Sequence, residues 1–346
     1  MKQVKILVAL IAGLFAFTSV QAGEVGVSGS MQATYSSNAD VTTGNSLGMN
    51  TDLTFSGSTD TDFGTATWTM GTDGTFLGES GADHTFKLAT DFGTIGVGNS
   101  GDAANAVDDI TPTAFEEANG SNSGSYSSDV GAGMDGSMSF SYGNGDLFGT
   151  GISVAFNYYP RLDATTNNEK GTSSDANANT SSAQSYNVGI PLSGLPVLGD
   201  TVLGGMKITA GYNESDARLT NGVGLRGGTV AANLPIGPLS IGYQVKAHQA
   251  LDTGTATAEA TKAFYKDDVL GIAYAINDDF AISYNLYESD KHIHTSGEVE
   301  QETKAINVAY TIGGLTLALQ DAKTDNSGYS TGTSDDVRTF SVKTAF

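Results

Sequence analysis

A small set of residues in this chain could take part in chemistry. The chain has no cysteine, and its four histidines are His84, His248, His292 and His294. The last two lie two positions apart, so they would share one face of a strand and could bind a metal weakly. Their hairpin offers no third ligand at an obvious spacing. We therefore expect a solvated pair, with no metal site and no cofactor.

A second candidate is the sequence Gly44-Asn45-Ser46-Leu47-Gly48, which matches the G-x-S-x-G pattern of a hydrolase. That pattern needs a sharp turn from a strand into a helix, whereas this match lies in a polar loop. No other spacing supports a Ser–His pair at one rim. We predict that no residue is catalytic, so the function must come from the elements that the rest of the chain forms.

Composition narrows the class of protein. The 346 residues include 45 glycines and 6 prolines, and 39% are hydrophobic, which is poor material for a large helical core. Length alone leaves the number of domains open, since a closed all-β barrel of this size can be one unit. The net charge of -22 repels phosphate backbones and excludes nucleic acid as a partner. The absence of cysteine suits a chain that passes through an oxidising compartment.

The first 22 residues have the pattern of a secretory signal. Lys2 and Lys5 precede an apolar run, and small residues lead to Ala22 at the expected cleavage site. An uncleaved anchor is the alternative, but the run is too short to cross hydrocarbon of about 30 Å. We expect cleavage after Ala22 and a single domain over residues 23–346.

Apolar residues recur at every second position over most of this domain, as in strands with one apolar face. Leu239, Ile241, Tyr243 and Val245 form one such run. The intervening positions carry mainly small polar residues, which suits the wall of a wide, water-filled lumen. The pattern predicts sixteen strands, over 24–36, 46–57, 64–71, 84–91, 93–99, 136–142, 151–159, 184–190, 205–213, 226–234, 239–248, 262–276, 280–289, 300–311, 315–323 and 337–346.

The connections between these strands alternate in length. Tight turns at 91–93, 235–238, 277–279 and 313–314 contrast with long polar loops at 36–46, 72–83, 100–135, 160–183, 213–225, 249–261, 290–299 and 324–336. Short turns at one end and long loops at the other are typical of an outer-membrane barrel. The long apolar connection 191–204 departs from this rule. Tyrosines near strand ends suit an interfacial girdle: Tyr35, Tyr142, Tyr158, Tyr159, Tyr212, Tyr287 and Tyr310.

The end of the chain carries a more specific pattern. Phe340, Val342 and Phe346 share one strand face, and the chain finishes on the aromatic residue. This terminal strand resembles the signal that barrel-insertion machinery reads, and residues 24–29 resemble the first strand of Gram-negative general porins. The resemblance implies a transmembrane antiparallel up-and-down barrel of sixteen strands in the outer membrane. It further implies a homotrimer, surrounded by lipid and lipopolysaccharide, through which small hydrophilic solutes diffuse.

In that family the long loop after the fifth strand folds inward as a constriction. The matching segment, residues 100–135, has no lysine or arginine and carries a series of acids. If it folds inward, these acids line the narrowest point with negative charge, which favours cations. The acids are Asp102, Asp108, Asp109, Glu116, Glu117 and Asp129.

The family usually places arginines on the wall opposite this loop, and here the sequence departs from it. None of the four arginines lies at the middle of a strand on the polar face. We expect Lys87, Lys207 and Lys246 to take their place, with Lys343 nearer the periplasmic rim. Because these cations are fewer than the loop acids, we predict weak cation selectivity.

Three alternatives stay open. A substrate-specific channel would need an aromatic slide in the lumen, for which Tyr159, Tyr265 and Tyr287 are few. A structural or adhesive barrel would have a plugged lumen. A secreted acidic β-protein would be soluble without detergent.

Overall fold

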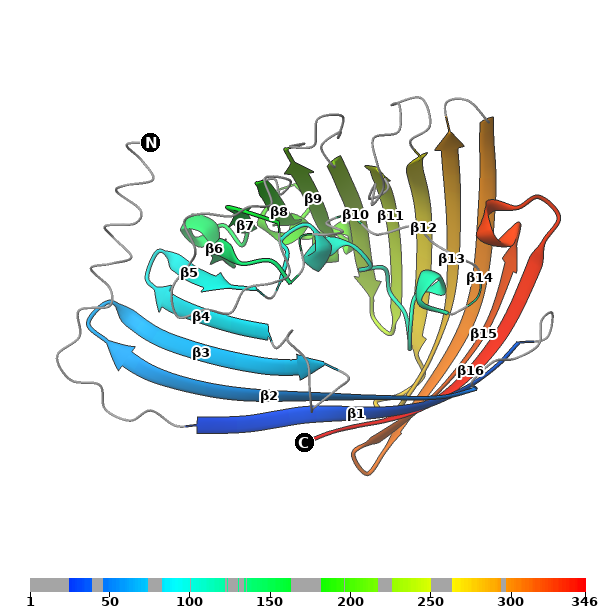
Figure 1. The fold of residues 1–346 in the computed structure, drawn as a ribbon, viewed down its shortest axis with the longest axis horizontal. Helices are drawn as coiled ribbons and strands as arrows, with labels where there is room; N and C mark the ends of the chain where they lie inside the picture. The colour runs from blue at the N-terminus through cyan, green and yellow to red at the C-terminus, as the bar shows by residue number, and fades with distance from the viewer. Residues whose placement is uncertain are drawn as a thin grey trace, which may run out of the picture.

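The chain folds into one closed barrel of sixteen antiparallel strands, each paired with its neighbours in the sequence (Figure 1). The computed structural model describes residues 25–38, 46–73, 83–99, 101–121, 123, 130, 134, 136–162, 182–195, 197–216, 226–249, 263–293 and 297–346. The predicted fold class is confirmed. The strands are β1 (Val25–Asn38), β2 (Leu47–Thr61), β3 (Gly64–Asp73), β4 (Asp83–Thr90), β5 (Gly93–Gly98), β6 (Ser139–Asn144), β7 (Ser153–Tyr159), β8 (Ala183–Pro191), β9 (Lys207–Ser215), β10 (Arg226–Ile236), β11 (Leu239–Gln249), β12 (Ala263–Ala275), β13 (Phe280–Ile293), β14 (Gly297–Ile312), β15 (Leu315–Asp325) and β16 (Ser334–Ala345).

The barrel closes where the first strand meets the last. β1 and β16 pair in antiparallel register, from Ser30 opposite Ala345 to Asn38 opposite Val337. Just beyond the register, the backbones of Gly29 and Phe346 exchange two hydrogen bonds of 2.9 Å. Since each of the sixteen described strands then has two partners, backbone groups are satisfied within the wall, as a hydrocarbon surrounding requires.

The period of two in the sequence arises because the wall has two different surroundings. On β11, Gln244 and Lys246 point into the barrel and are buried there, whereas Ile241 and Tyr243 point outward and are exposed. Small and polar side chains therefore face the lumen, and apolar ones form the outer surface. Adjacent side chains of a strand point to opposite faces, so one strand serves both surroundings.

Aromatic residues line the outer surface, and several lie near strand ends as the girdle prediction requires, whereas Trp68 and Tyr243 lie at the middle of β3 and β11. Exposed examples are Tyr35, Trp68, Tyr158, Tyr186, Tyr212, Tyr243, Tyr274 and Tyr310. Two of the tyrosines that we assigned to the girdle do not belong to it. Tyr159 and Tyr287 are only 1% and 2% exposed because their side chains lie on the lumen face, beneath the chain that folds inward.

The predicted strand limits hold to within a few residues, with one larger difference. We predicted a long loop over 290–299, but β13 continues through Ile293 and β14 begins at Gly297. The sequence signal is lost there because both faces of these strand ends carry charged or polar residues. Backbone pairing nevertheless continues, with Asp290 opposite Glu300 and His292 opposite Glu298.

The long apolar connection 191–204 forms two short 3-10 turns, η4 (Leu192–Gly194) and η5 (Val202–Gly205), at the end of the barrel that carries the short turns. The expected signal, residues 1–22, lies outside the described residues. Where the structure describes the chain, it contains no helix with the length and apolar character that a membrane span needs.

Candidate functional site

The chain between β5 and β6 turns into the barrel instead of projecting from its rim (Figure 1). We call residues 101–121 the inward segment. It contains two short 3-10 turns, η1 (Asn105–Val107) and η2 (Ala118–Gly120), and crosses the lumen face of the wall from β8 toward β15. The first residue of η2, Ala118, is fully buried in an apolar cluster with Val269, Tyr287 and Ala305.

Amide side chains of the wall hold the backbone of the inward segment. Gln244 donates to the Val107 carbonyl at 3.0 Å and accepts from the Ile110 N–H at 3.3 Å. Wall amides from five further strands donate to carbonyls of the segment in the same way. They are Asn187 on β8, Asn233 on β10, Asn285 on β13, Asn307 on β14 and Gln320 on β15. Hydrogen bonds from fixed strands thus position a segment whose own regular structure is limited to the two short 3-10 turns.

Three wall glycines give the segment room to lie against the wall. A Cβ atom at Gly211 would lie 2.7 Å from the Val107 side chain, and one at Gly242 would lie 2.3 Å from Cδ of Pro112. At Gly271 it would lie 2.6 Å from the Pro112 carbonyl oxygen. Because real Cβ contacts are not this short, a larger residue at any of these positions requires the segment or the neighbouring wall residues to shift.

Lys246 forms the main charged contact between the wall and the inward segment. Its Nζ atom lies 3.2 Å from Oδ1 of Asp108 and 2.6 Å from Oδ1 of Asp109, and its side chain is completely buried. The Asp108 side chain is 1% exposed and also accepts the Val130 N–H at 3.0 Å. Lys246 therefore lies beneath the segment and binds it directly, instead of facing it across the open lumen.

The five acids of the segment fall into two groups. Asp102, Asp108 and Glu117 are buried between the segment and the wall or within the segment, whereas Asp109 and Glu116 keep contact with the lumen. Asp102, for example, accepts the hydroxyl of Ser185 on β8 and the Ala104 N–H. The buried group thus holds the segment in place, and the exposed group can act on a passing ion.

Burial also changes the ionisation of the segment. Desolvation, with the nearby charge of Asp109, raises the pKa of Glu117 to about 7, against a smaller opposing effect of its Thr111 hydrogen bonds and of Lys246. The Thr111 N–H donates to Oε1 of Glu117 at 2.6 Å. Desolvation likewise raises the pKa of Glu116, while Gln32 and Lys343 partly offset it. Glu116 therefore lies close to the wall formed by β1 and β16.

Two of the predicted wall lysines face the lumen without being buried. Lys87 on β4 is exposed and lines a recess of about 530 Å³ with Asp102 and Asn144. Lys207 on β9 is exposed beside Gly189 of β8. The structure therefore brings Lys246 into contact with Asp108 and Asp109, whereas Lys87 and Lys207 lie apart from Lys246. Lys343, which we had placed toward the periplasmic rim, lies near Glu116.

The remaining sequence candidates have simple surroundings. Phe340 and Val342 lie on β16 opposite Tyr35 and Ala33 of β1, and Phe346 is exposed beside Gly29. Ser46 leads directly into a strand, β2, and not into a helix. Asp129, His294 and the first part of the G-x-S-x-G match lie outside the described residues.

The three lumen tyrosines do not form an aromatic slide. Tyr159 and Tyr287 are almost fully buried, and Tyr265 is 6% exposed because Tyr329 and His248 pack on its ring. Their rings are covered and cannot stack against a passing solute.

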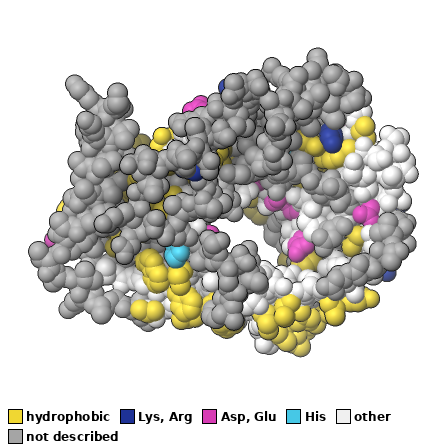
Figure 2. Space-filling view, viewed as in Figure 1, with side chains coloured by type: hydrophobic (Ala, Val, Ile, Leu, Met, Phe, Trp, Pro, Cys, Tyr) yellow, Lys and Arg dark blue, Asp and Glu magenta, His cyan; other side chains and the backbone are white. Residues whose placement is uncertain are grey.

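Chemically, the site is a narrowed aqueous passage with fixed charges of both signs. Figure 2 shows an opening through the barrel with acidic side chains beside it. The exposed carboxylates attract cations, and the exposed lysines oppose them.

Comparisons with known proteins agree with this architecture. The sequence profile of the Gram-negative porin family matches residues 7–343. A porin structure refined at 1.8 Å resolution has 17% sequence identity and a TM-score of 0.62, covering 93% of this chain and 100% of that one. OmpF of Salmonella typhi, solved with daunomycin, has 13% identity and a TM-score of 0.64, covering 94% and 98%.

An anion-selective porin from Comamonas acidovorans has 13% identity and a TM-score of 0.64, covering 94% of this chain and 100% of that one. No protein among the curated sequences matches the chain. At these identities the solved structures support the fold and do not indicate which ions pass.

Proposed function

Because the chain belongs to the Gram-negative porin family, an outer-membrane channel family, we propose that it conducts small hydrophilic solutes and ions by passive diffusion with weak cation selectivity. The observation that carries this proposal is the division of the acids of the inward segment. Asp109 and Glu116 remain in contact with the lumen, while Lys246 compensates the buried Asp108. When all groups are ionised, the five acids of the segment outnumber the lumen lysines Lys87, Lys207, Lys246 and Lys343 by one, so the passage has a small excess of negative charge.

Conductance across a planar bilayer tests this proposal. The folded protein in detergent is added to a bilayer with a salt gradient, and the reversal potential is read. Current with a reversal potential of cationic sign supports the proposal. An anionic sign would mean that the wall lysines outweigh the segment. No current from verified folded barrels would favour the plugged, adhesive alternative.

We further propose that the channel is a homotrimer inserted by the barrel-assembly machinery, with Phe340, Val342 and Phe346 as the signal that it reads. A trimer form is known for one structural neighbour, OmpT of Vibrio cholerae. Current steps that recur in threes, and a threefold mass by light scattering, are the expected results. Current that appears in single steps, together with the mass of one chain by light scattering, would contradict the trimer.

Lipopolysaccharide is the proposed lipid partner on the outer surface. Lys304, Lys323 and Arg338 lie on the outward faces of β14, β15 and β16 and line a recess of about 480 Å³ with Ile306 and Tyr284. These cations lie beside exposed apolar side chains, which suits phosphate groups at a lipid surface. Each is also paired with a carboxylate of the same face, with which a phosphate would compete: Lys304 with Glu302, Lys323 with Asp325 and Arg338 with Asp321.

Neutralising the exposed Asp109 and the half-buried Glu116 together is expected to remove the cation preference. In Asp109→Asn/Glu116→Gln, each lost carboxylate removes about 1 kcal/mol of attraction for a cation at contact distance in water. The reversal potential should move to zero or to anionic sign. The control Glu302→Gln/Asp321→Asn makes the same charge change on the outer surface and should leave the reversal potential unchanged. An equal shift in both variants would show that the overall charge sets selectivity.

Although the Glu117 side chain is buried, its charge lies near that of Asp109 and adds to the negative potential of the passage, so the selectivity should also depend on pH through Glu117. Its pKa of about 7 lies above the ordinary value of 4.5, so it gains its charge as the pH rises through neutrality. Cation selectivity should therefore increase between about pH 5 and about pH 9, with its midpoint near the pKa of Glu117. The folded state holds this proton more tightly than the unfolded state. Its contribution to stability is thus complete below pH 4.5 and is lost as the pH rises through about 7.

Reversal potentials measured across this range check the expectation. Glu117→Gln should give a flat profile, because its amide does not titrate. A step of unchanged size in that variant would assign the titration to another group.

A further inference from the structure

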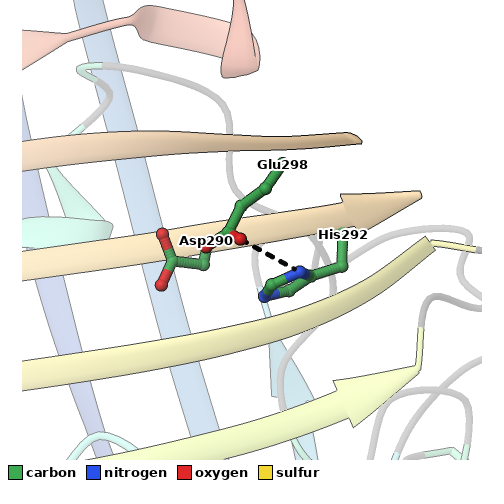
Figure 3. Close-up of side chains that lie close together, drawn as sticks. All are labelled: Asp290, His292 and Glu298. Carbon is green, nitrogen blue, oxygen red and sulfur yellow. Dashed lines mark ion pairs between the residues drawn. The ribbon is translucent and has the colours of Figure 1, made fainter. Parts of the chain in front are cut away.

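We propose that Asp290, His292 and Glu298 form a binding site for a divalent first-row transition metal ion such as Zn²⁺. The three side chains lie on the outward face of β13 and β14, at the end of the barrel that carries the long loops (Figure 3). One ligand atom from each residue lies within 4.8 Å of the other two. This inference concerns the outer surface and does not depend on the proposed conductance.

The register of the two strands creates this convergence. Asp290 and His292 are two residues apart on β13, so they point to the same face. Glu298 of β14 lies directly opposite His292, and its Oε2 atom is 3.5 Å from Nδ1 of His292. All three ligands are therefore held by paired strand backbone, which limits the cost of ordering them.

The set of donors indicates the class of metal. One imidazole nitrogen and two carboxylate oxygens suit Zn²⁺ and its neighbours in the first transition row, whereas Ca²⁺ and Mg²⁺ prefer oxygen ligands alone. Zn–ligand bonds of about 2.0–2.1 Å place tetrahedral ligand atoms about 3.3–3.4 Å apart. The His292–Glu298 pair already has nearly this separation. Asp290 must approach by a rotation of its side chain, and the fourth position is left for water.

The negative charges around the site further favour the binding of a cation. Next to the site, Asp290 lies opposite Glu300 and Glu288 lies opposite Glu302, and like charges directly opposite each other destabilise a sheet. The nearest described lysines on this face are paired with acids that are not ligands: Lys304 contacts Glu302, and Lys266, which lies opposite Asp290 on β12, contacts Asp268. Lys291, between the two ligands of β13, points to the lumen face and lies over the rings of Tyr265 and Tyr329.

The sequence alone suggests only half of this site. It shows His292 and a second histidine two residues later, and it offers no third ligand at a regular spacing. The additional ligands become visible once β14 is known to pair with β13 so that Glu298 faces His292.

Calorimetric titration of the detergent-folded full-length barrel with ZnCl₂ tests the proposal. We expect one saturable site, and we expect His292→Ala, Asp290→Asn and Glu298→Gln each to weaken Zn²⁺ binding by about tenfold or more. Glu302→Gln is the matched control, because it removes one charge from the same acidic face without removing a ligand. It should change the affinity much less. Excess Ca²⁺ or Mg²⁺ should not displace the Zn²⁺.

Four results would overturn the site. Equal weakening by Glu302→Gln and Glu298→Gln, or ready displacement by Ca²⁺, would show that the acidic face attracts cations without selecting them. Loss of binding in His292→Ala alone, with the carboxylate variants unchanged, would show a histidine site without Asp290 and Glu298. Unchanged binding in all three ligand variants would place the Zn²⁺ elsewhere. Heat-induced unfolding monitored on a gel confirms that each variant is a folded barrel.

Discussion

Replacement of Lys246 by methionine is expected to release the inward segment from the lumen wall. The change keeps most of the length and of the apolar packing of the side chain but removes the ammonium group that lies 3.2 Å from Asp108, whose side chain is 1% exposed. Removing one partner of a buried ion pair costs about 3–5 kcal/mol of folding free energy. We expect the inward segment to rearrange so that Asp108 can reach water. The single-channel conductance should rise and its open-state current should become noisier.

Lys207→Met is the matched control for this experiment. It removes the same charge from the lumen wall, but Lys207 is exposed and is held by neither Asp108 nor Asp109. It should therefore change the reversal potential toward cations with little change in conductance. If both variants changed the conductance equally, the role of Lys246 would be that of a wall charge and not of an anchor.

The second large effect is expected from filling the contact between the wall and Pro112. In Gly242→Ala the new methyl group would lie 2.3 Å from Cδ of Pro112 and 2.0 Å from Oδ1 of Asn233, so one of the two neighbours must move. Overpacking of this kind costs about 1–3 kcal/mol. Asn233 also donates to the Ile110 carbonyl, so both of these contacts of the segment are disturbed together. We expect the segment to move toward the axis and the conductance to fall.

Gly228→Ala on the adjacent strand β10 provides the control. A Cβ atom there would make ordinary contacts, the shortest being 3.4 Å to the carbonyl oxygen of Gly211. Its conductance should equal that of the unaltered protein. A double variant with Gly271→Ala should deepen the effect of Gly242→Ala, because both residues face Pro112. An unchanged conductance in Gly242→Ala would mean that the wall, and not the segment, yields.

The sequence pattern predicts the barrel well because one physical cause acts on every strand. Ile241 and Tyr243 must face outward while Gln244 and Lys246 face inward, and this requirement recurs around the wall. The signal fails at the ends of β13 and β14, where both faces meet water and charged residues occupy successive positions. Strand pairing continues there, but apolar alternation no longer reports it.

The site was only partly predictable for a different reason. Alternation places Lys246 and Lys207 equally on the lumen face. Which of the two lies beneath the inward segment depends on the height of each residue along the barrel and on the path of the segment, and neither is encoded in local spacing. The role of the wall amides also depends on the path of the inward segment, which the local sequence does not encode. Asn285 and Asn307 look like ordinary lumen residues until Pro112 and Glu116 are found above them.

The pairing of β1 with β16 has a consequence for the order in which this protein can fold. These strands are the most distant in the sequence, yet they form a continuous seam of nine residue pairs from Ser30 to Asn38. Until that seam forms, both strands present unpaired backbone edges, which can pair with another chain. Bringing such distant segments together is slow, because the chain loses the entropy of closing a long loop before any stabilising contact between β1 and β16 can form. The chain must therefore be kept apart from its copies until both ends can meet, so a chain stalled before the seam forms is the species most prone to aggregate.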